Sequence, residues 1–211
     1  LNLDLRDYDQ FDNLIRKIKP THILHLASVS HVPTSINDPH KTFEVNLMAT
    51  LHMFDSILKI TPKTKIIYIS SSEVYGKSFK NGLALTEDAV LQPENPYAVS
   101  KMATDLMAQQ FAKQGLLVII LRPFNHIGPG QSEDFVASSF AAQIARIESG
   151  ICPPVIHVGN LDSVRDFLPV DNVVNAYIAV LKDIDKISSG TIYNICSSKP
   201  IKIRDMLDQL I

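Results

Sequence analysis

The feature that most constrains the fold is an alternation of short apolar runs with longer amphipathic stretches. Four runs rich in β-branched and aromatic residues, at residues 21–27, 65–70, 116–122 and 191–196, have the length of β-strands. The middle two are apolar almost without alternation, which is typical of strands that helices cover on both faces. We therefore predict a sheet that is buried on both sides.

The stretches between these runs repeat apolar residues at helical spacing, and a chain that alternates strands with helices forms a parallel sheet with right-handed crossovers. After residue 122 the pattern changes to a segment rich in Pro, Gly and Asn, followed by a helix and a short strand at residues 155–158. The sequence predicts a doubly wound α/β fold with a smaller lobe. The predicted helices cover residues 9–18, 43–60, 97–113, 135–148 and 171–181.

Composition excludes several classes of partner. The formal charge of -2 and the lack of a Lys/Arg run argue against nucleic acid or an anionic membrane as the main partner. No apolar stretch approaches the roughly 20 residues that span a bilayer. Two well-separated cysteines, Cys152 and Cys196, favour a reducing, cytoplasmic location. Among the seven histidines, His22 and His25 lie three apart on a predicted strand and so face opposite sides, and we expect no metal site.

Both ends of the chain resemble interrupted elements. Residues 1–7 have the pattern of the end of a strand, and residues 203–211 stop inside an amphipathic helix. We expect the chain to be part of a longer protein.

Polar residues follow one of the buried strands, at the edge where open α/β sheets bind ligands. Ser71, Ser72 and Glu73 come directly after the run at residues 65–70. Taken alone, a serine cluster there is also the ordinary start of a loop.

A tyrosine and a lysine lie four residues apart in a predicted helix. Tyr97 and Lys101 therefore share one face, about one turn apart. A free phenol titrates near pH ~10, and a neighbouring ammonium lowers that pKa by stabilising the phenolate. With a serine hydroxyl beside them, these groups suit hydride transfer at a carbon bearing a hydroxyl or carbonyl, in which the tyrosine moves the proton. The pattern Y-x-x-x-K alone occurs by chance in many helices.

The order of these motifs resembles the extended short-chain dehydrogenases/reductases, the NAD-dependent epimerase/dehydratase family. Two stretches, R-P-F-N-H-I-G-P-G-Q at 122–131 and V-G-N-L-D-S-V-R-D-F at 158–167, are similar to its GDP-mannose group, which contains GDP-mannose 4,6-dehydratase and GDP-4-keto-6-deoxy-D-mannose reductase. The G-P-G-Q continuation is closer to the reductase. The other matching pieces are Asp4-Leu5, H-L-A-S at 25–28, N-L-M-A-T at 46–50, S-S-S-E-V-Y-G at 70–76 and P-Y-A-V-S-K at 96–101.

The resemblance implies a role for each matching position. Ser71 is implied to orient the sugar oxygen, Tyr97 to act as acid/base, and Lys101 to lower the pKa of Tyr97 and hold the nicotinamide ribose. The implied substrate contacts include Arg165, whose guanidinium suits bidentate pairing with a diphosphate. The implied cofactor-binding residues are Asp4, Leu5, Leu26, Ala27, Ser28, Tyr97 and Lys101, and the implied substrate-binding residues are Asn125, Val136 and Arg165.

Glu73 leaves the reaction open. In the dehydratase branch a glutamate at this position takes the C5 proton, a step that a reductase lacks. The resemblance implies a nucleotide-sugar oxidoreductase of GDP-deoxyhexose biosynthesis that reduces the C4 ketone of GDP-4-keto-6-deoxy-D-mannose with NAD(P)H. GDP-mannose 4,6-dehydratase and a nucleotide-sugar 4-epimerase are the alternatives among enzymes. A catalytically silent nucleotide-binding member of the family is the alternative outside them.

The resemblance also implies a division of the chain. A Rossmann-type dinucleotide-binding domain is expected over residues 1–122, rejoined by 168–196, and a substrate-binding lobe over 123–167 and 197–211. The family's first strand, its Gly-rich turn, the residue that selects NADP or NAD and the last part of the lobe are not among the 211 residues. Relatives commonly dimerise through helices equivalent to 43–60 and 97–113, so we expect a homodimer that binds a GDP-linked deoxy sugar.

Overall fold

The chain divides into two compact units. The structure is a computed structural model that describes residues 2–211. One unit runs to Pro123 and includes Ile178–Ile195, and the other consists of Phe124–Tyr177 and Cys196–Ile211. Each unit therefore combines two separate segments of the sequence.

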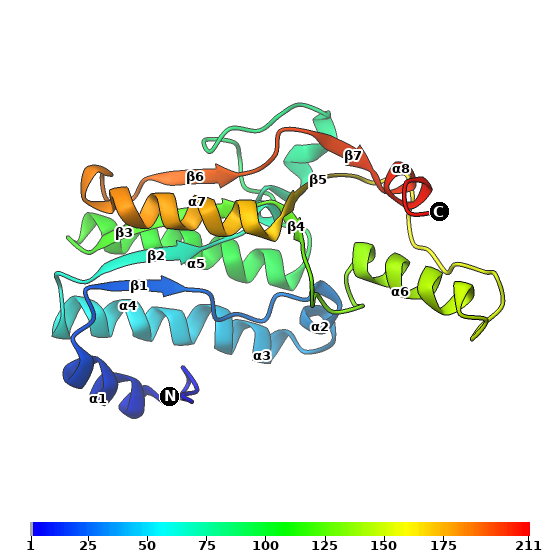
Figure 1. Cartoon of the computed structure of the whole chain (residues 1–211). Helices are drawn as coiled ribbons and strands as arrows, with labels where there is room; N and C mark the ends of the chain where they lie inside the picture. The colour runs from blue at the N-terminus through cyan, green and yellow to red at the C-terminus, as the bar shows by residue number, and fades with distance from the viewer. Residues whose placement is uncertain (1) are drawn as a thin grey trace. The chain divides into compact units, whose positions relative to one another are not determined.

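The first unit is built on a parallel sheet of four strands. These are β1 (His22–His25), β2 (Lys65–Ile69), β3 (Leu117–Pro123) and β6 (Ile192–Ile195), in the order β1-β2-β3-β6 (Figure 1). All four strands predicted from the apolar runs are confirmed. The two central strands are buried nearly throughout, as their uninterrupted apolar sequences indicate.

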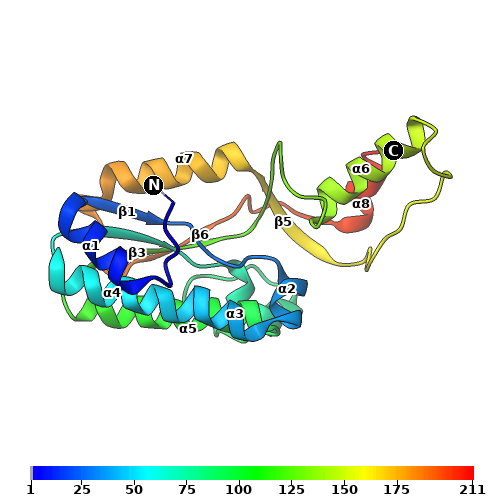
Figure 2. The same cartoon turned by 90° about the horizontal axis from the view of Figure 1, so that it is seen from below.

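Helices cover the sheet on both faces, which confirms the doubly wound α/β fold. Helices α4 (Ala49–Ile60) and α5 (Pro96–Lys113) lie on one face, and α1 (Tyr8–Ile18) packs against α4 (Figure 2). On the opposite face lie residues 178–183, the part of α7 (Val170–Asp183) that belongs to this unit. The crossover connections place the carboxyl ends of the strands at one edge of the sheet.

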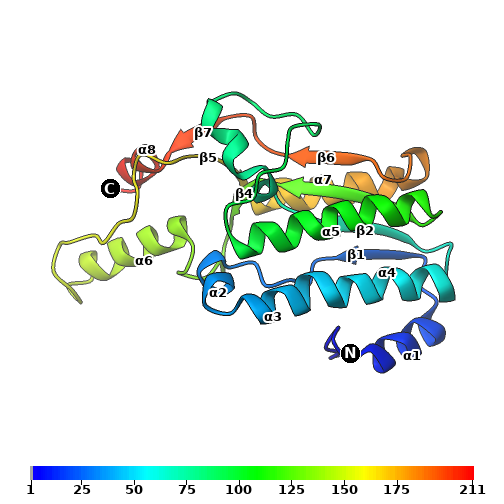
Figure 3. The same ribbon diagram turned by 180° about the vertical axis from the view of Figure 1, so that it is seen from behind.

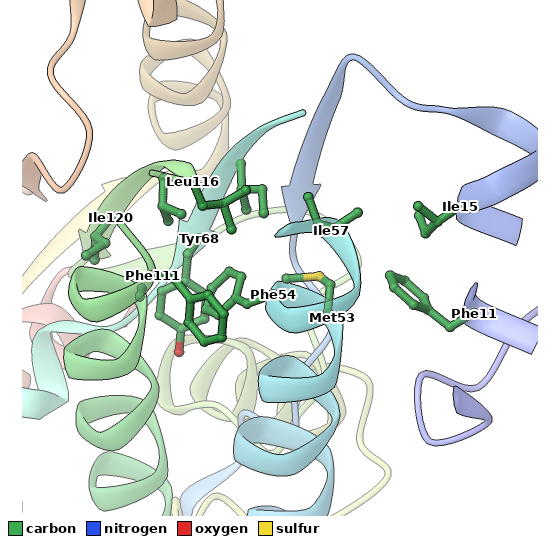
Figure 4. Packing of buried hydrophobic residues seen from close by; sticks show 12 residues of the cluster. Phe11, Ile15, Met53, Phe54, Ile57, Tyr68, Phe111, Leu116 and Ile120 are labelled. Atoms are coloured by element: carbon green, nitrogen blue, oxygen red, sulfur yellow. The ribbon is translucent and has the colours of Figure 1, made fainter. Parts of the chain in front are cut away.

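The main hydrophobic core fills the space between α1, α4, α5 and the sheet (Figure 4). The ring of Phe54 lies 5.4 Å from that of Phe111 and 6.1 Å from that of Tyr68, centroid to centroid. On α4, the apolar side chains recur at the three- and four-residue spacing that brings them to one face. The labelled core residues are Phe11, Ile15, Met53, Phe54, Ile57, Tyr68, Phe111, Leu116 and Ile120.

The predicted helix at residues 43–60 is interrupted by a wider turn. Helix α3 (Pro39–Phe43) leads into a π-helical turn (Glu44–Met48), which continues as α4 along the same line (Figure 3). The main-chain oxygen of Asn46, inside this turn, accepts a hydrogen bond of 3.0 Å from the Thr104 hydroxyl of α5. A side-chain donor thus satisfies a carbonyl of the widened turn, and such turns occur often near functional sites. A short helix that was not predicted, α2 (Val32–Asn37), precedes this region.

The second unit has its own small sheet and core. Strand β5 (Val164–Pro169) pairs in parallel with β4 (Asn125–Ile127) and antiparallel with β7 (Pro200–Lys202). Helices α6 (Val136–Glu148) and α8 (Ile203–Asp208) pack together. Their shared core contains the buried residues Phe140, Ile203 and Leu207 and the half-buried Val136, Ile144, Ile156, Leu161 and Phe167.

Two predicted elements are wrong. Residues 155–158 form no strand, because the side-chain amide of Gln143 bonds both main-chain groups of His157, at 2.8 and 3.1 Å, in place of a neighbouring strand. Residues 2–7 form no strand either: the Asp7 amide donates to the Asp4 oxygen in a turn, and the Asp7 side chain then caps α1. Within residues 2–211, no helix combines the length and the apolar character that crossing a bilayer requires.

Candidate active site

The end of β2 supplies the serine of the candidate site. Ser70, Ser71 and Ser72 are buried directly after this strand, at the carboxyl edge of the sheet. The Ser71 hydroxyl accepts a hydrogen bond of 3.2 Å from the Glu73 amide and so caps the 3₁₀-helix η2 (Ser72–Asn81). The cap fixes where the Ser71 side chain stands.

Helix α5 supplies the tyrosine and the lysine. The helix begins at Pro96, and the Asn95 side chain caps it by accepting from the Ala98 amide at 2.8 Å. The hydroxyl of Ser35, in α2, accepts from the Tyr97 amide at 3.2 Å. The side chains of Tyr97 and Lys101 therefore stand in the first turns of a well-anchored helix.

The structure brings Ser71, Tyr97 and Lys101 together. The Ser71 hydroxyl lies close enough to the Tyr97 phenol to act on it, in the direction that lowers the pKa of the phenol. The Lys101 ammonium donates a hydrogen bond of 2.8 Å to the main-chain oxygen of Ile69, the last residue of β2. Both Tyr97, which is 8% exposed, and Lys101, which is 4% exposed, are thus held against the strand end that carries Ser71.

The pKa of Tyr97 differs from the expectation. It is raised above its usual value of 10.0, because burial disfavours the phenolate and the charge of Glu73 adds to this effect, while the hydrogen bond with Ser71 opposes it. Lys101 was expected to lower this pKa. Its own pKa is lowered to about 7 by burial, and its ammonium bonds the Ile69 oxygen. In this state the phenol is therefore held in its neutral form.

The loop after β1 carries Leu26, Ala27 and Ser28, the expected cofactor contacts. Leu26 is 59% exposed although it is apolar. The next residue, Val29, is fixed by the Asn46 side chain, which accepts from the Val29 amide at 2.8 Å and donates to the Val29 oxygen at 3.0 Å. The Asn46 amide also donates to Ser100 at 2.9 Å and so ties this loop to α5.

Asp4 and Leu5 lie in the turn before α1. The Asp4 carboxylate pairs with the Arg6 guanidinium at 2.6 Å, and these hydrogen bonds lower its pKa to about 2. The Leu5 side chain packs against the main core. The Asp4 carboxylate is therefore charged over the whole physiological range.

The three expected substrate contacts belong to the second unit. Asn125 opens β4 and pairs with Phe167 of β5. Val136 is the first residue of α6 and packs against the core of this unit. Arg165, in β5, is exposed, and its guanidinium donates to the Val164 oxygen at 2.8 Å.

A buried ion pair was missed in the sequence. Arg122, at the end of β3, pairs with Asp105 of α5, and their side chains are 2% and 0% exposed. R-P-F-N was noted as a motif, but Arg122 received no role. The sequence offers an Arg near the end of an apolar strand and an Asp one turn after Lys101, but no local pattern joins the two.

A metal centre does not emerge from the part of the chain that the structure describes. Within residues 2–211, no three His, Cys, Asp or Glu side chains are grouped so as to hold a metal ion. The Nε2 atom of His25 lies 3.0 Å from the Thr50 hydroxyl, and the Nδ1 atom of His22 lies 3.0 Å from that of Thr21.

Known proteins resemble this chain over nearly its whole length. The chain is 38% identical over 208 residues to GDP-6-deoxy-D-mannose reductase of Pseudomonas aeruginosa, covering 98% of this chain and 67% of that protein. It is 33% identical over 188 residues to GDP-mannose 4,6 dehydratase 2 of Caenorhabditis elegans, covering 85% of this chain and 47% of the relative. The chain therefore spans about two thirds of the one relative and about half of the other.

Solved structures show the same fold. The structure of RMD from Pseudomonas aeruginosa complexed with NADPH matches with a TM-score of 0.90 at 36% identity, covering 99% of this chain and 69% of that one. A double mutant of dTDP-glucose 4,6-dehydratase from Streptomyces venezuelae, with NAD bound, matches with a TM-score of 0.86 at 26% identity, covering 99% and 61%.

A family model confirms the resemblance seen in the motifs. The model described as GDP-mannose 4,6 dehydratase matches residues 1–210. The two relatives compared by sequence are named for GDP sugars, in agreement with the expected GDP-mannose group. The chain belongs to the GDP-mannose 4,6 dehydratase family.

Proposed function

We propose that this chain carries the catalytic centre of a nucleotide-sugar reductase, which reduces the C4 ketone of GDP-4-keto-6-deoxy-D-mannose with NAD(P)H. The observation that carries the proposal is that Ser71, Tyr97 and Lys101 are buried together at the carboxyl edge of the sheet, with the Lys101 ammonium bonded to the Ile69 oxygen two residues before Ser71. The 38% identity to a GDP-6-deoxy-D-mannose reductase and the G-P-G-Q sequence at 128–131 support the choice of reaction.

The residues at this edge fit a nicotinamide cofactor. Among residues 2–211, the Ile69 oxygen is the one hydrogen-bond acceptor found for the Lys101 ammonium, so two of its three N–H groups are left to bind the hydroxyls of a ribose. Leu26 offers an exposed apolar surface where a flat ring can pack. When bound, the reduced cofactor supplies hydride to C4. Relatives hold NADPH or NAD, and either is compatible with these residues.

Tyr97 is suited to donate the proton that the reduction needs. Hydride addition to C4 turns the carbonyl oxygen into an alkoxide, which takes the phenolic proton to give the alcohol. A raised pKa keeps the phenol protonated at neutral pH, which is the form that donates. The Ser71 hydroxyl holds the same oxygen, and the Lys101 ammonium, near its midpoint at pH ~7, stabilises the phenolate that results.

The proposed substrate contacts lie in the second unit. We propose that the first unit binds the dinucleotide and the second binds the sugar nucleotide through Asn125, Val136 and Arg165. Arg165 is exposed, and its planar guanidinium matches the oxygens of a diphosphate.

Glu73 favours a second candidate, GDP-mannose 4,6-dehydratase. Glu73 lies two residues after Ser71, and its charge acts on the Tyr97 phenol by raising its pKa. A carboxylate in that position suits removal of the C5 proton during loss of water. The reductase remains our first choice, because the chain is 38% identical to a GDP-6-deoxy-D-mannose reductase and 33% identical to a GDP-mannose 4,6 dehydratase.

Two assays of the full-length protein separate the candidates. The first supplies GDP-4-keto-6-deoxy-D-mannose with NADPH or NADH and follows loss of the reduced cofactor. The second supplies GDP-mannose with NADP⁺ and no reductant. Reduced product in the first assay alone supports the proposal, and a 4-keto-6-deoxy sugar in the second assigns the dehydratase instead.

We further propose that the protein forms a homodimer through α4 and α5. Both helices carry exposed apolar side chains, Leu51 on α4 and Leu106 on α5, and Met48 in the preceding π-helical turn is exposed as well. Exposed apolar groups on adjacent helices suit an interface between two copies. Changing Leu51 and Leu106 to Glu together should yield a monomer in sedimentation analysis, and an unchanged mass would place the interface elsewhere.

We also propose a cytoplasmic location. The two cysteines, Cys152 and Cys196, are half-buried free thiols, and disulfide-free proteins are typical of reducing compartments.

A further inference from the structure

A bidentate ion pair lies buried in the first unit. The Arg122 Nε atom donates to Asp105 Oδ2 at 2.9 Å, and Arg122 Nη2 donates to Asp105 Oδ1 at 3.0 Å. Removing two charges from water is costly, so a buried pair adds little net stability, and in some proteins such a pair serves to fix geometry. What the pair connects is therefore informative.

The carboxylate joins β2 to α5 next to the candidate site. The Ser70 hydroxyl donates to Asp105 Oδ2 at 2.7 Å, and Ser70 directly precedes Ser71. Asp105 follows Lys101 by one turn of the same helix. The carboxylate thus fixes the strand end that carries the serine to the helix that carries Tyr97 and Lys101.

The guanidinium holds the segment that runs from Glu73 toward Tyr97. Arg122 Nη1 donates to the Tyr75 phenol at 2.9 Å and to the Glu87 main-chain oxygen at 2.8 Å. Tyr75 follows Glu73 by two residues, and its hydroxyl donates to Asn194 Oδ1 of β6 at 2.7 Å. One buried cation therefore anchors this segment at two points.

We propose that Ser70, Tyr75, Asp105 and Arg122 are positioning residues, which hold Ser71 and Glu73 at a set distance from Tyr97 and Lys101. This inference rests on the proposed function, because it assigns what keeps the same catalytic groups aligned. Ser70, Tyr75 and Asp105 act through the main chain, each one to four residues from a group of the site. Arg122 acts through its bonds to Tyr75 and Asp105. Catalytic groups need this support, since a misplacement of about 1 Å can cost roughly 100-fold in rate.

The test removes single hydroxyls from the full-length protein. Ser70→Ala and Tyr75→Phe each delete one hydroxyl of the network. Thr64→Val is the matched control, because it deletes a buried hydroxyl that donates to the Pro20 oxygen at 2.6 Å, at the opposite end of β2 from Ser71. All three variants are compared with wild type for kcat, KM and melting temperature.

We expect kcat to fall about 10-fold in Ser70→Ala and Tyr75→Phe with KM changed less than about 2-fold, since alignment and not binding is lost. Thr64→Val should lower the melting temperature to a similar extent and keep kcat within about 2-fold. If kcat falls in proportion to the melting temperature in all three variants, the control included, the positioning role is wrong. A wild type that is inactive in the reductase, dehydratase and 4-epimerase assays overturns the proposed function first, and the inference with it.

Discussion

The Lys101 ammonium lies 2.8 Å from the main-chain oxygen of Ile69, and the two residues belong to different elements, α5 and β2. Through this bond a buried amine adds to the apolar packing that holds α5 against the strand that ends at the candidate site. Burial lowers the pKa of that amine from 10.5 to about 7.

Lys101 should therefore make the stability of the protein depend on pH. Between about pH 7 and 10.5 the unfolded chain binds a proton that the folded chain does not, so stability falls as the pH falls through this range and levels off below pH 7. In Lys101→Met this pH-dependent loss of stability is absent, because methionine does not bind a proton. We expect the free energy of unfolding of the variant, relative to that of wild type, to rise by about 1.4 kcal/mol for each pH unit from pH 9.5 down to 7. Urea unfolding of both proteins at several pH values measures this difference in stability. A difference that does not change with pH contradicts the prediction.

Tyr97→Phe should lower kcat by roughly 10²–10⁴-fold, because the variant lacks the proton that the alkoxide takes. The fold should be retained, since the aromatic ring stays. Tyr193→Phe is the control: Tyr193 lies on β6 and is exposed. Steady-state kinetics with the reductase substrate measures kcat for both variants. Near-normal turnover of Tyr97→Phe would show that Tyr97 is not the proton donor.

Gly76→Ala should lower the free energy of unfolding more than Gly82→Ala does. Both glycines have positive φ, at 46° and 67°, but a Cβ on Gly76 would lie 1.9 Å from the main-chain oxygen of Gln92, whereas one on Gly82 would meet no atom within 4 Å. We expect a loss of about 2–4 kcal/mol in the free energy of unfolding for Gly76→Ala. Gly82→Ala should lose about 1 kcal/mol, from backbone strain alone. Equal losses in urea titrations show that the segment around Gln92 can yield.

GDP should raise the melting temperature of the full-length protein more than UDP or dTDP at equal concentration. The reason is that a ligand bound only by the folded state stabilises it, and at equal concentration the tighter ligand stabilises it more. Arg165→Ala should reduce the shift caused by GDP. The control Arg146→Ala removes only an exposed pair with Glu133 and should leave the shift unchanged. Equal shifts for the three nucleotides contradict the GDP specificity.

The large sheet could be predicted because its central strands are apolar throughout. The strand β5 could not, since V-R-D-F-L-P carries two charges and only one of its six residues is buried. The strand predicted at residues 155–158 has a suitable sequence, but a side-chain amide from α6 takes its main-chain bonds. Local sequence does not reveal such a competitor, which comes from a helix that precedes it in the chain.

The residues of the candidate site could be predicted from their types and spacing. The direction in which their pKa values shift could not. Tyr97 and Lys101 lie on one helix face, as four-residue spacing requires. The direction of the Tyr97 pKa depends on how deeply the phenol is buried and on the charge of Glu73, which only the folded chain determines. The pair of Arg122 and Asp105 joins residues 17 positions apart on different elements, so no local pattern gave its function.

The place of β6 beside β3 has a consequence for synthesis on the ribosome. When Pro123 has left the ribosome, β3 has β2 on one side but no partner on the other, and the unpaired N–H and C=O groups of this apolar strand are a template for pairing with other chains. Its partner begins at Ile192, about 70 residues later, which takes roughly 3–15 s at ordinary rates of translation. During that interval the nascent chain should be most prone to aggregate and most dependent on chaperones.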